Sequence, residues 1–251
     1  ELIARALKAQ GVNTLYTLCG GHILPIYEGC LNNHIAVLDF RHEQAAAHAA
    51  DAYARLTHNI GVAAVTAGPG VTDAVTGVAN AYQARSPMIL FGGAAPIKTR
   101  GMGALQEMPQ IDMFKTFTKA SFTIERTEDI PDLMRYAITT ALSGRPGPIF
   151  IEVPFDILFN AIDDPGGFER VTIQPLEPEV GALTQIFELL RNAKKPVLIA
   201  GTQVYWDKAY DALRDLTDQT GIPVFTNGGG RGTLPMNHPN CFKSARGKAL
   251  R

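Results

Sequence analysis

The chain has few cysteines: Cys19, Cys30 and Cys241 are the only ones among its 251 residues. Their odd number and the absence of any CxxC spacing argue against a disulfide framework and against a cysteine-based zinc site. Scattered free thiols of this kind are typical of a protein kept in a reducing compartment, so we expect the cytoplasm.

No charge of one sign is in excess, since 23 Lys and Arg residues face 24 Asp and Glu residues and give a formal net charge of -1. This balance excludes a broad basic surface for nucleic acid or anionic lipid. No apolar run reaches membrane-spanning length, and the amino terminus lacks the basic-then-apolar pattern of a signal peptide. We expect neither a nucleic-acid partner nor a membrane partner, and any phosphate-binding site must be local.

Apolar runs and amphipathic stretches alternate along the first part of the chain. The periodicity predicts helices at 2–10, 23–31, 43–57, 71–85 and 128–143, and strands at 15–18, 36–40, 61–66, 88–92 and 148–153. Such alternation favours right-handed crossovers and a parallel sheet covered on both faces, in an α/β fold. The segment between residues 93 and 127 is expected to be a long glycine-containing connection.

Composition divides the chain into three regions. Residues 1–160 are predicted to form one α/β domain, and residues 161–180, rich in Asp, Pro, Gly and Glu, read as a linker. Residues 181–251 begin a second α/β unit of about 70 residues, below the ~100–150 that are most common for a domain. We therefore expect a longer protein, in which residues 244–251 are a helix interrupted in mid-course.

The stretch around Glu43 combines a strand end, a carboxylate and a helix of small residues. Glu43 follows Arg41 and His42 and opens a predicted helix that contains seven alanines. A carboxylate at a helix N-terminus can have a purely structural role, since its negative charge interacts favourably with the helix dipole. The alanines, however, leave space for something to pack closely. A carboxylate in such an apolar crevice is costly to leave charged and unpaired, so it is suited to share a proton with a nitrogen base.

A second tight turn follows the strand at 61–66. Gly68, Pro69 and Gly70 connect that strand to the next helix, which carries Asp73 in its first turn. The glycines allow a ligand to approach the backbone, and the helix amides face it. The turn matches neither the GxGxxG fingerprint nor a P-loop, and glycine-rich turns are common in α/β proteins for steric reasons. Because parallel strands end at one edge of a sheet, we expect this turn beside Glu43.

Four linked motifs resemble the pyrimidine-binding domain of thiamine-diphosphate enzymes, in that family's order and spacing. They are Arg41-His42-Glu43-Gln44, Thr66-Ala67-Gly68-Pro69-Gly70, Gly103-Ala104-Leu105-Gln106-Glu107 and Ser143-Gly144-Arg145-Pro146-Gly147-Pro148. The similarity is closest to acetolactate synthases and their acetolactate synthase-like and 2-hydroxyacyl-CoA lyase relatives. The second unit resembles the beginning of the family's Rossmann-like central domain, which holds FAD in acetolactate synthases and ADP or CoA in oxalyl-CoA decarboxylase.

The resemblance implies roles for the two turns. Glu43 would hydrogen-bond N1′ of the aminopyrimidine and promote the imino tautomer that removes the C2 proton of the thiazolium. Gly68, Pro69 and Gly70 would contact the aminopyrimidine ring, and Gly21 and Asp73 are further candidate cofactor-binding residues. Asp73 stands where the family usually carries Asn.

Two loops resemble the family's substrate side. His22 follows Gly21 in a loop where acetolactate synthases usually carry Ala, and a histidine there is similar to benzaldehyde lyase and the acetolactate synthase-like lyases. We expect His22 to exchange a proton near the substrate hydroxyl, with a structural histidine as the alternative. Gln106 matches the family's active-site glutamine, which in the dimer reaches the partner subunit's cofactor site. Leu105 replaces an aromatic residue common in acetolactate synthases.

Two further residues match positions near a nucleotide. Arg145 falls where FAD-containing members and ADP-binding oxalyl-CoA decarboxylase use an arginine, and Gly201 would allow a nucleotide to approach. An exposed turn arginine and an ordinary glycine turn are the alternatives.

Together these features predict a thiamine-diphosphate-dependent, acetolactate synthase-like enzyme that forms or cleaves C–C bonds in 2-keto acids or 2-hydroxy ketones. Activity like that of 2-hydroxyacyl-CoA lyase, oxalyl-CoA decarboxylase or benzaldehyde lyase is the alternative, and a non-catalytic nucleotide-binding fragment is the third. The family's Gly-Asp-Gly metal and diphosphate motif is absent from the 251 residues, so no Mg²⁺ ligand is assigned within them. We expect thiamine diphosphate with Mg²⁺, and FAD or ADP as a further option, in a homodimer or homotetramer with the active site between subunits.

Overall fold

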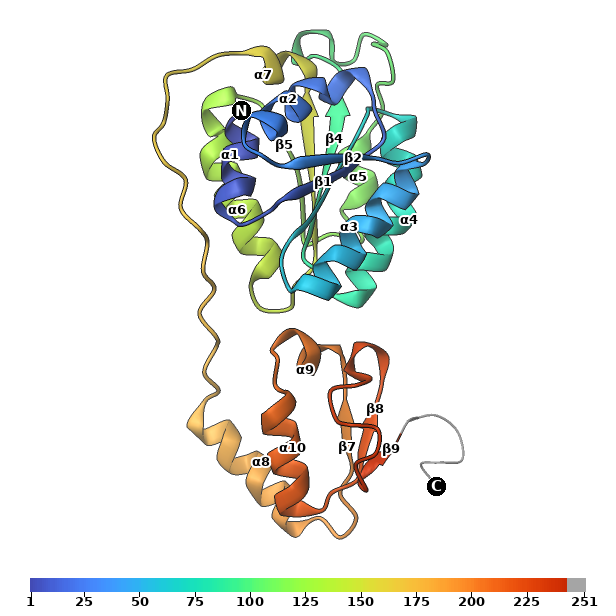
Figure 1. Ribbon diagram of the computed structural model, residues 1–251, viewed down its shortest axis with the longest axis vertical. Coiled ribbons are helices and arrows are strands. Elements are labelled where there is room, and N and C mark those ends of the chain that lie inside the picture. The colour runs from blue at the N-terminus through green and yellow to red at the C-terminus, as the bar shows by residue number, and fades with distance from the viewer. Residues whose placement is uncertain (243–251) are drawn as a thin grey trace. The chain divides into compact units, whose positions relative to one another are not determined.

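The computed structural model describes residues 1–242, which form two units (Figure 1). The first unit is Glu1–Ile173, and the second begins at Gln174. Residues 160–179 contain neither helix nor strand. The helix predicted at 244–251 lies outside the described residues.

The first unit contains a parallel sheet of six strands, which confirms the predicted α/β class. The strand order is β2-β1-β3-β4-β6-β5, and every neighbouring pair is parallel. The strands are β1 (Thr14–Thr17), β2 (Ala36–Asp39), β3 (Gly61–Val65), β4 (Met88–Ala94), β5 (Ala120–Thr123) and β6 (Pro148–Pro154). Strands β3, β4 and β6 are buried along their whole length, as expected for parallel strands covered on both faces.

Helices cover both faces of this sheet, with α1 and α6 on one side and α3 and α4 on the other (Figure 1). The helices are α1 (Leu2–Ala9), α2 (Leu24–Asn32), α3 (Glu43–Thr57), α4 (Pro69–Ala84), α5 (Gln110–Phe114), α6 (Ile130–Leu142) and α7 (Phe155–Phe159). Three 3₁₀ turns accompany them: η1 (Gly21–Ile23), η2 (Ile97–Thr99) and η3 (Thr127–Asp129). Helix α3 has the bounds that the alanine-rich pattern predicts.

The segment expected to be a long connection contains both α5 and β5. Strand β5 has no long apolar run of its own, and it is ordered by pairing with β6 from Ala120 opposite Ile149 to Thr123 opposite Glu152. Helix α5 is anchored by Phe114, whose ring stacks on Phe150 with 4.1 Å between centroids. Tertiary pairing therefore outweighs the weak local pattern.

The first unit also extends beyond residue 160. Arg5 forms an ion pair of 2.8 Å with Asp164, and its guanidinium lies 5.2 Å from the ring centroid of Phe168. The Val171 N–H donates to Oε1 of Gln10 at 2.9 Å. These contacts tie the first half of the predicted linker to α1.

The second unit contains a parallel sheet of order β7-β8-β9. Its elements are α8 (Val180–Asn192), β7 (Leu198–Ala200), α9 (Thr202–Trp206), α10 (Tyr210–Thr220), β8 (Val224–Thr226), η4 (Gly228–Gly230) and β9 (Cys241–Phe242). This confirms a second α/β unit after the linker. Among residues 1–242, no helix has both the length and the apolar character that crossing a bilayer requires.

Helices α3 and α4 pack so closely that one position between them requires glycine. A Cβ added at Gly77 would lie 2.5 Å from the Cβ of Ala47. We expect Gly77→Ala to lower the free energy of unfolding by about 1–3 kcal/mol, because α4 must move away from α3. The measurement is urea unfolding followed by circular dichroism.

Thr76→Ala is the matched control, because Thr76 is exposed on the same helix. It should change the free energy of unfolding by no more than about 0.5 kcal/mol. Equal effects of the two substitutions would contradict the close packing of α3 on α4.

Candidate active site

Helix α3 brings Glu43 to the carboxyl edge of the sheet. Strand β2 ends at Asp39, and His42 caps the helix by accepting a hydrogen bond on Nδ1 from the Gln44 N–H at 3.2 Å. Glu43 is only 9% exposed, although it is the first helical residue. The small residues of the helix, Ala46, Ala47 and Ala50 among them, are buried against the sheet and α4.

The turn after β3 lies against Glu43. Gly68 has φ +62° and ψ -112°, a backbone conformation that strongly favours glycine. A Cβ added at Gly70 would lie 3.3 Å from Oε1 of Glu43 and 2.8 Å from Cγ2 of Thr66. The missing Cβ of Gly70 therefore keeps the space in front of the Glu43 carboxylate open.

Glu43 is a buried residue that makes no hydrogen bond or ion pair among residues 1–242, and its carboxylate oxygens keep some contact with solvent. Ligand atoms of His42, Glu43 and Asp73 lie within 4.8 Å of one another, so Asp73 is near the carboxylate. Histidine and carboxylate are also metal-ligand types, and our expectation of no metal ligand in this chain stays a prediction. A mostly buried carboxylate without a protein partner is suited to accept a hydrogen bond from a ligand with a nitrogen donor.

The loop after β1 completes this edge of the site. Gly20 packs on Thr66, since a Cβ at Gly20 would lie 2.3 Å from the Cβ of Thr66. His22 is half-buried in η1, and its Nδ1 lies 3.1 Å from Oγ1 of Thr66. Thr66 therefore contacts both predicted turns, although the sequence analysis gave it no role; its place at the start of the turn was the available signal.

Burial shapes the proton chemistry of this loop. Loss of solvation lowers the pKa of His22, so its ring is neutral at pH 7. The ring packs edge-on against Phe155, with 6.1 Å between centroids. Burial raises the pKa of Tyr27 to about 12, and its hydroxyl lies 2.6 Å from Oγ1 of Thr17. Tyr27 is thus a neutral hydrogen-bonding group, while His22 can donate or accept a proton.

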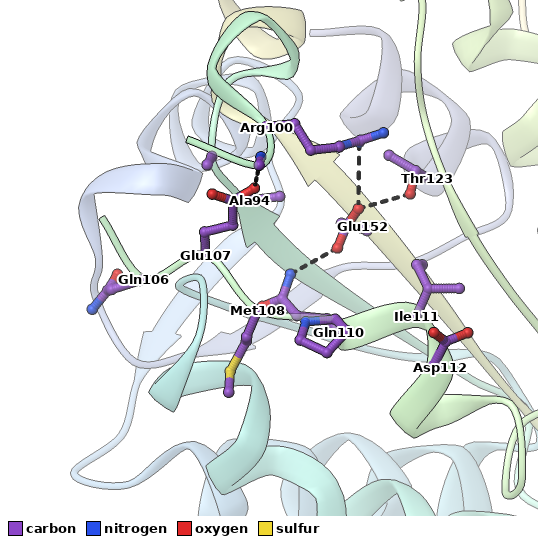
Figure 2. Close-up of a pocket in the computed structure, with 13 residues that line it drawn as sticks. Ala94, Arg100, Gln106, Glu107, Met108, Gln110, Ile111, Asp112, Thr123 and Glu152 are labelled. Atoms are coloured by element: carbon purple, nitrogen blue, oxygen red, sulfur yellow. Dashed lines mark hydrogen bonds and ion pairs between the residues drawn. The ribbon is translucent and has the colours of Figure 1, made fainter. Parts of the chain in front are cut away.

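Gln106 reaches the turn from a separate loop. A Cβ at Gly68 would lie 2.7 Å from the backbone oxygen of Gln106, so this loop packs on the turn of its own chain. The Gln106 side chain extends away from Glu152 (Figure 2), and Leu105 is 77% exposed. The loop borders a pocket of about 540 Å³.

Two buried polar residues of this pocket were not singled out from the sequence. Gln110 and Glu152 point toward each other beneath the loop and are joined by a hydrogen bond of 2.9 Å (Figure 2). Their sequence contexts, a short helix and a strand with one interior charge, carry no motif. The only available signal was a glutamate inside the apolar run of β6.

The two residues predicted for a nucleotide site belong to different units. Arg145 lies in the turn before β6, at the amino edge of the parallel sheet, with its guanidinium 5.6 Å from the ring centroid of Tyr82. Gly201 belongs to the second unit, where the hydroxyl of the next residue, Thr202, accepts from the Gly229 N–H at 3.2 Å. The carboxyl ends of β7 and β8 thus carry adjoining glycine-containing turns, and the predicted roles of both residues stay predictions.

These features define an α/β protein in which a carboxylate faces a glycine turn at the carboxyl edge of the first sheet, the edge at which open α/β sheets bind ligands. Residues 1–113 match the N-terminal TPP-binding domain of thiamine pyrophosphate enzymes, and residues 183–249 match the central domain of the same enzymes. The chain belongs to this thiamine pyrophosphate enzyme family. The resemblance found in the sequence motifs is thereby confirmed.

Individual relatives carry two different activities in their names. The chain is 40% identical over 252 residues to the acetolactate synthase large subunit IlvG of Mycobacterium tuberculosis. It is 39% identical over 288 residues to 2-hydroxyacyl-CoA lyase 2 of Caenorhabditis elegans and 35% identical over 292 residues to the human protein of that name. Each match covers 100% of this chain but only 45–46% of the relative, so the chain spans less than half the length of these proteins.

The Gln106 loop has its own pH dependence, because Glu107 holds it together. The hydrogen bond from the Gly101 N–H, with those from Ala104 and Gly103, keeps the pKa of the Glu107 carboxyl below its ordinary value. A carboxylate with a lowered pKa keeps its stabilising contacts as the pH falls, until the pH passes its folded-state pKa. We expect the amide NMR signals of these three residues to titrate with midpoints below about pH 4.3.

Glu107→Gln removes the ionisable group and should abolish this titration. A midpoint at or above about 4.3 in the unsubstituted protein would contradict the capping role of Glu107.

Proposed function

We propose that this chain is part of a thiamine-diphosphate-dependent enzyme that forms or cleaves C–C bonds, with Glu43 as its proton-exchanging residue. The observation that carries the proposal is the unpaired carboxylate of Glu43, a residue only 9% exposed, which faces the open space at Gly70. This arrangement fits an aminopyrimidine ring, which offers a nitrogen to the carboxylate and a flat face to the glycine turn. When bound, thiamine diphosphate supplies a nucleophilic carbon and an electron sink.

In this proposal, the residues around the ring have different roles. Glu43 holds and returns a proton at the ring nitrogen, and its burial strengthens that hydrogen bond. Gly68, Pro69 and Gly70 line the ring with backbone, and Asp73 lies near enough to Glu43 to influence the proton. The diphosphate and Mg²⁺ are held by residues outside this chain.

The first test uses Glu43→Gln in the full-length protein, with proton exchange at C2 of bound thiamine diphosphate followed by NMR. We expect exchange to slow by about 10²–10⁴-fold, the usual contribution of a positioned acid or base, while the cofactor still binds. Glu28→Gln, an exposed glutamate of α2, is the control and should exchange at the unsubstituted rate. Unchanged exchange in Glu43→Gln would refute the role.

For the substrate, we propose 2-keto acids or 2-hydroxy ketones, in a reaction of the acetolactate synthase type. The acetolactate-like run from Leu24 to Tyr27 supports this assignment. A lyase acting on 2-hydroxyacyl-CoA is the second candidate, and the position of His22 favours it. The neutral His22 ring lies beside Thr66 near the turn, where it can exchange a proton with a substrate hydroxyl.

The variant His22→Ala distinguishes the two candidate functions. Its products are analysed with pyruvate and with a 2-hydroxyacyl-CoA as substrates. If His22 exchanges the substrate proton, we expect cleavage of the CoA substrate to fall by about 10²-fold. Because the pKa of His22 is lowered, the unsubstituted rate should hold until the pH falls below about 6.5, and the variant should lose that acidic limb. His34→Asn, at an exposed position with φ +54°, is the control. Formation of acetolactate from pyruvate with no cleavage would instead support the first candidate.

We also propose the wider setting that the family resemblance implies. The active site lies between subunits of a homodimer or homotetramer in the cytoplasm, with Gln106 directed at the partner subunit's cofactor. Arg145 and Gly201 contact FAD or ADP where such a nucleotide is present. Mass spectrometry of cofactors released from the full-length protein distinguishes FAD, ADP and neither, and a preparation without thiamine diphosphate would favour the non-catalytic alternative.

A further inference from the structure

The geometry points to Gln110 as a positioning residue that holds the Gly68 turn in its cofactor-binding conformation through a buried hydrogen-bond chain to Glu152. This inference rests on the proposed function, because it concerns the turn that would contact the aminopyrimidine. The chain is drawn in part in Figure 2, where the Gln110 amide points at Glu152 and Glu152 is joined to Thr123 and Arg100.

The hydrogen-bond partners of the Gln110 side chain show which end of its amide is the oxygen and which is the nitrogen. Oε1 accepts from the backbone N–H of Gly68 at 2.8 Å, and Nε2 donates to the backbone oxygen of Gly93 at 3.0 Å. A backbone N–H can only donate and a carbonyl can only accept, so these partners fix the orientation of the amide. Gln110 is 2% exposed, and water cannot replace either contact without entering the core.

The amide therefore joins three neighbouring strand ends. Gly68 follows β3, Gly93 lies near the end of β4, and Glu152 lies in β6. Gly68 needs such a restraint, because its N–H is removed from water in an uncommon backbone conformation at the start of α4. Gly93 also contacts the His22 segment, since a Cβ at Gly93 would lie 2.5 Å from the Cβ of His22. One amide thus holds the Gly68 turn directly and also holds Gly93, on which the His22 segment packs.

Glu152 anchors the other end of the chain. It is 7% exposed, and its Oε1 accepts from Gln110 while its Oε2 accepts from the Thr123 hydroxyl at 2.7 Å. The Arg100 guanidinium lies 3.7 Å from the same Oε2 and compensates the charge. An ionised acceptor makes the stronger hydrogen bond, so Glu152 holds the Gln110 amide firmly.

Gln110→Met in the full-length protein tests this role, because methionine matches the size of glutamine without its hydrogen bonds. The readouts are the Kd values of thiamine diphosphate and of inorganic pyrophosphate, both with Mg²⁺, by titration calorimetry. We expect the Kd of thiamine diphosphate to rise about tenfold or more, as the loss of the buried hydrogen bond to the Gly68 turn allows. The Kd of pyrophosphate, which lacks the pyrimidine, should stay within about twofold of the unsubstituted value, well inside that tenfold step.

Thr118→Val is the matched control, because it removes a buried hydrogen bond, from the Thr118 hydroxyl to the backbone oxygen of Phe114 at 2.7 Å, that belongs to neither the Gly68 turn nor the chain to Glu152. It should lower the midpoint of thermal unfolding without raising the Kd of thiamine diphosphate. Equal loss of affinity for both ligands in Gln110→Met, or no loss for either, would overturn the inference.

A second set of variants tests the inference if Gln110→Met does not fold. The double exchange Gln110→Glu with Glu152→Gln keeps an acceptor for the Gly68 N–H and a donor toward residue 110. It should bind thiamine diphosphate more tightly than Gln110→Glu alone, and equal Kd values for the two would overturn the inference. If the unsubstituted protein itself does not bind thiamine diphosphate, the proposed function fails instead, which separates the two outcomes.

Discussion

The close approach of the Gly70 backbone to the Glu43 carboxylate is the contact on which this site depends. Glu43 is only 9% exposed, and no group in residues 1–242 forms a hydrogen bond or an ion pair with its carboxylate, so the carboxylate is free to pair with a ligand. The missing Cβ at Gly70 leaves room for that partner. In the proposed function, this position lets Glu43 bind a nitrogen base, whereas an exposed glutamate at a helix start would be an ordinary cap.

The fold maintains this contact by packing small residues. Helices α3 and α4 approach closely at Ala47 and Gly77, which places the start of α3 beside the turn before α4. The turn cannot relax away, because Gln110 holds Gly68 from below and Thr66 is wedged between Gly20 and Gly70. Large residues in this layer would separate the two turns, and the carboxylate would be hydrated. The alanine-rich helix is therefore part of the chemistry as well as of the core.

The segment between β4 and β6 contributes more than its sequence indicates. It supplies Gln106 against the turn, Glu107 as the cap of its own loop, and Gln110 beneath Gly68. All three contacts depend on β5 and α5 being fixed by β6 and by the stacking of Phe114 on Phe150. This segment is ordered by its contacts with the sheet, so we expect a substitution that disturbs those contacts to displace the residues that it supplies to the site.

The sequence by itself determined the alternation of strands and helices, the start of α3 at Glu43 and the glycine turn, because periodicity and turn chemistry act over a few residues. Together with family motifs, these local signals indicated the cofactor class. The parallel topology also predicted the glycine turn beside Glu43, but only the tertiary structure gave the close approach of Gly70 to Glu43, assigned Thr66 to both turns and revealed Gln110 under Gly68. Those contacts join residues 27 to 46 positions apart, and such pairings are set by how the strands are ordered in the sheet.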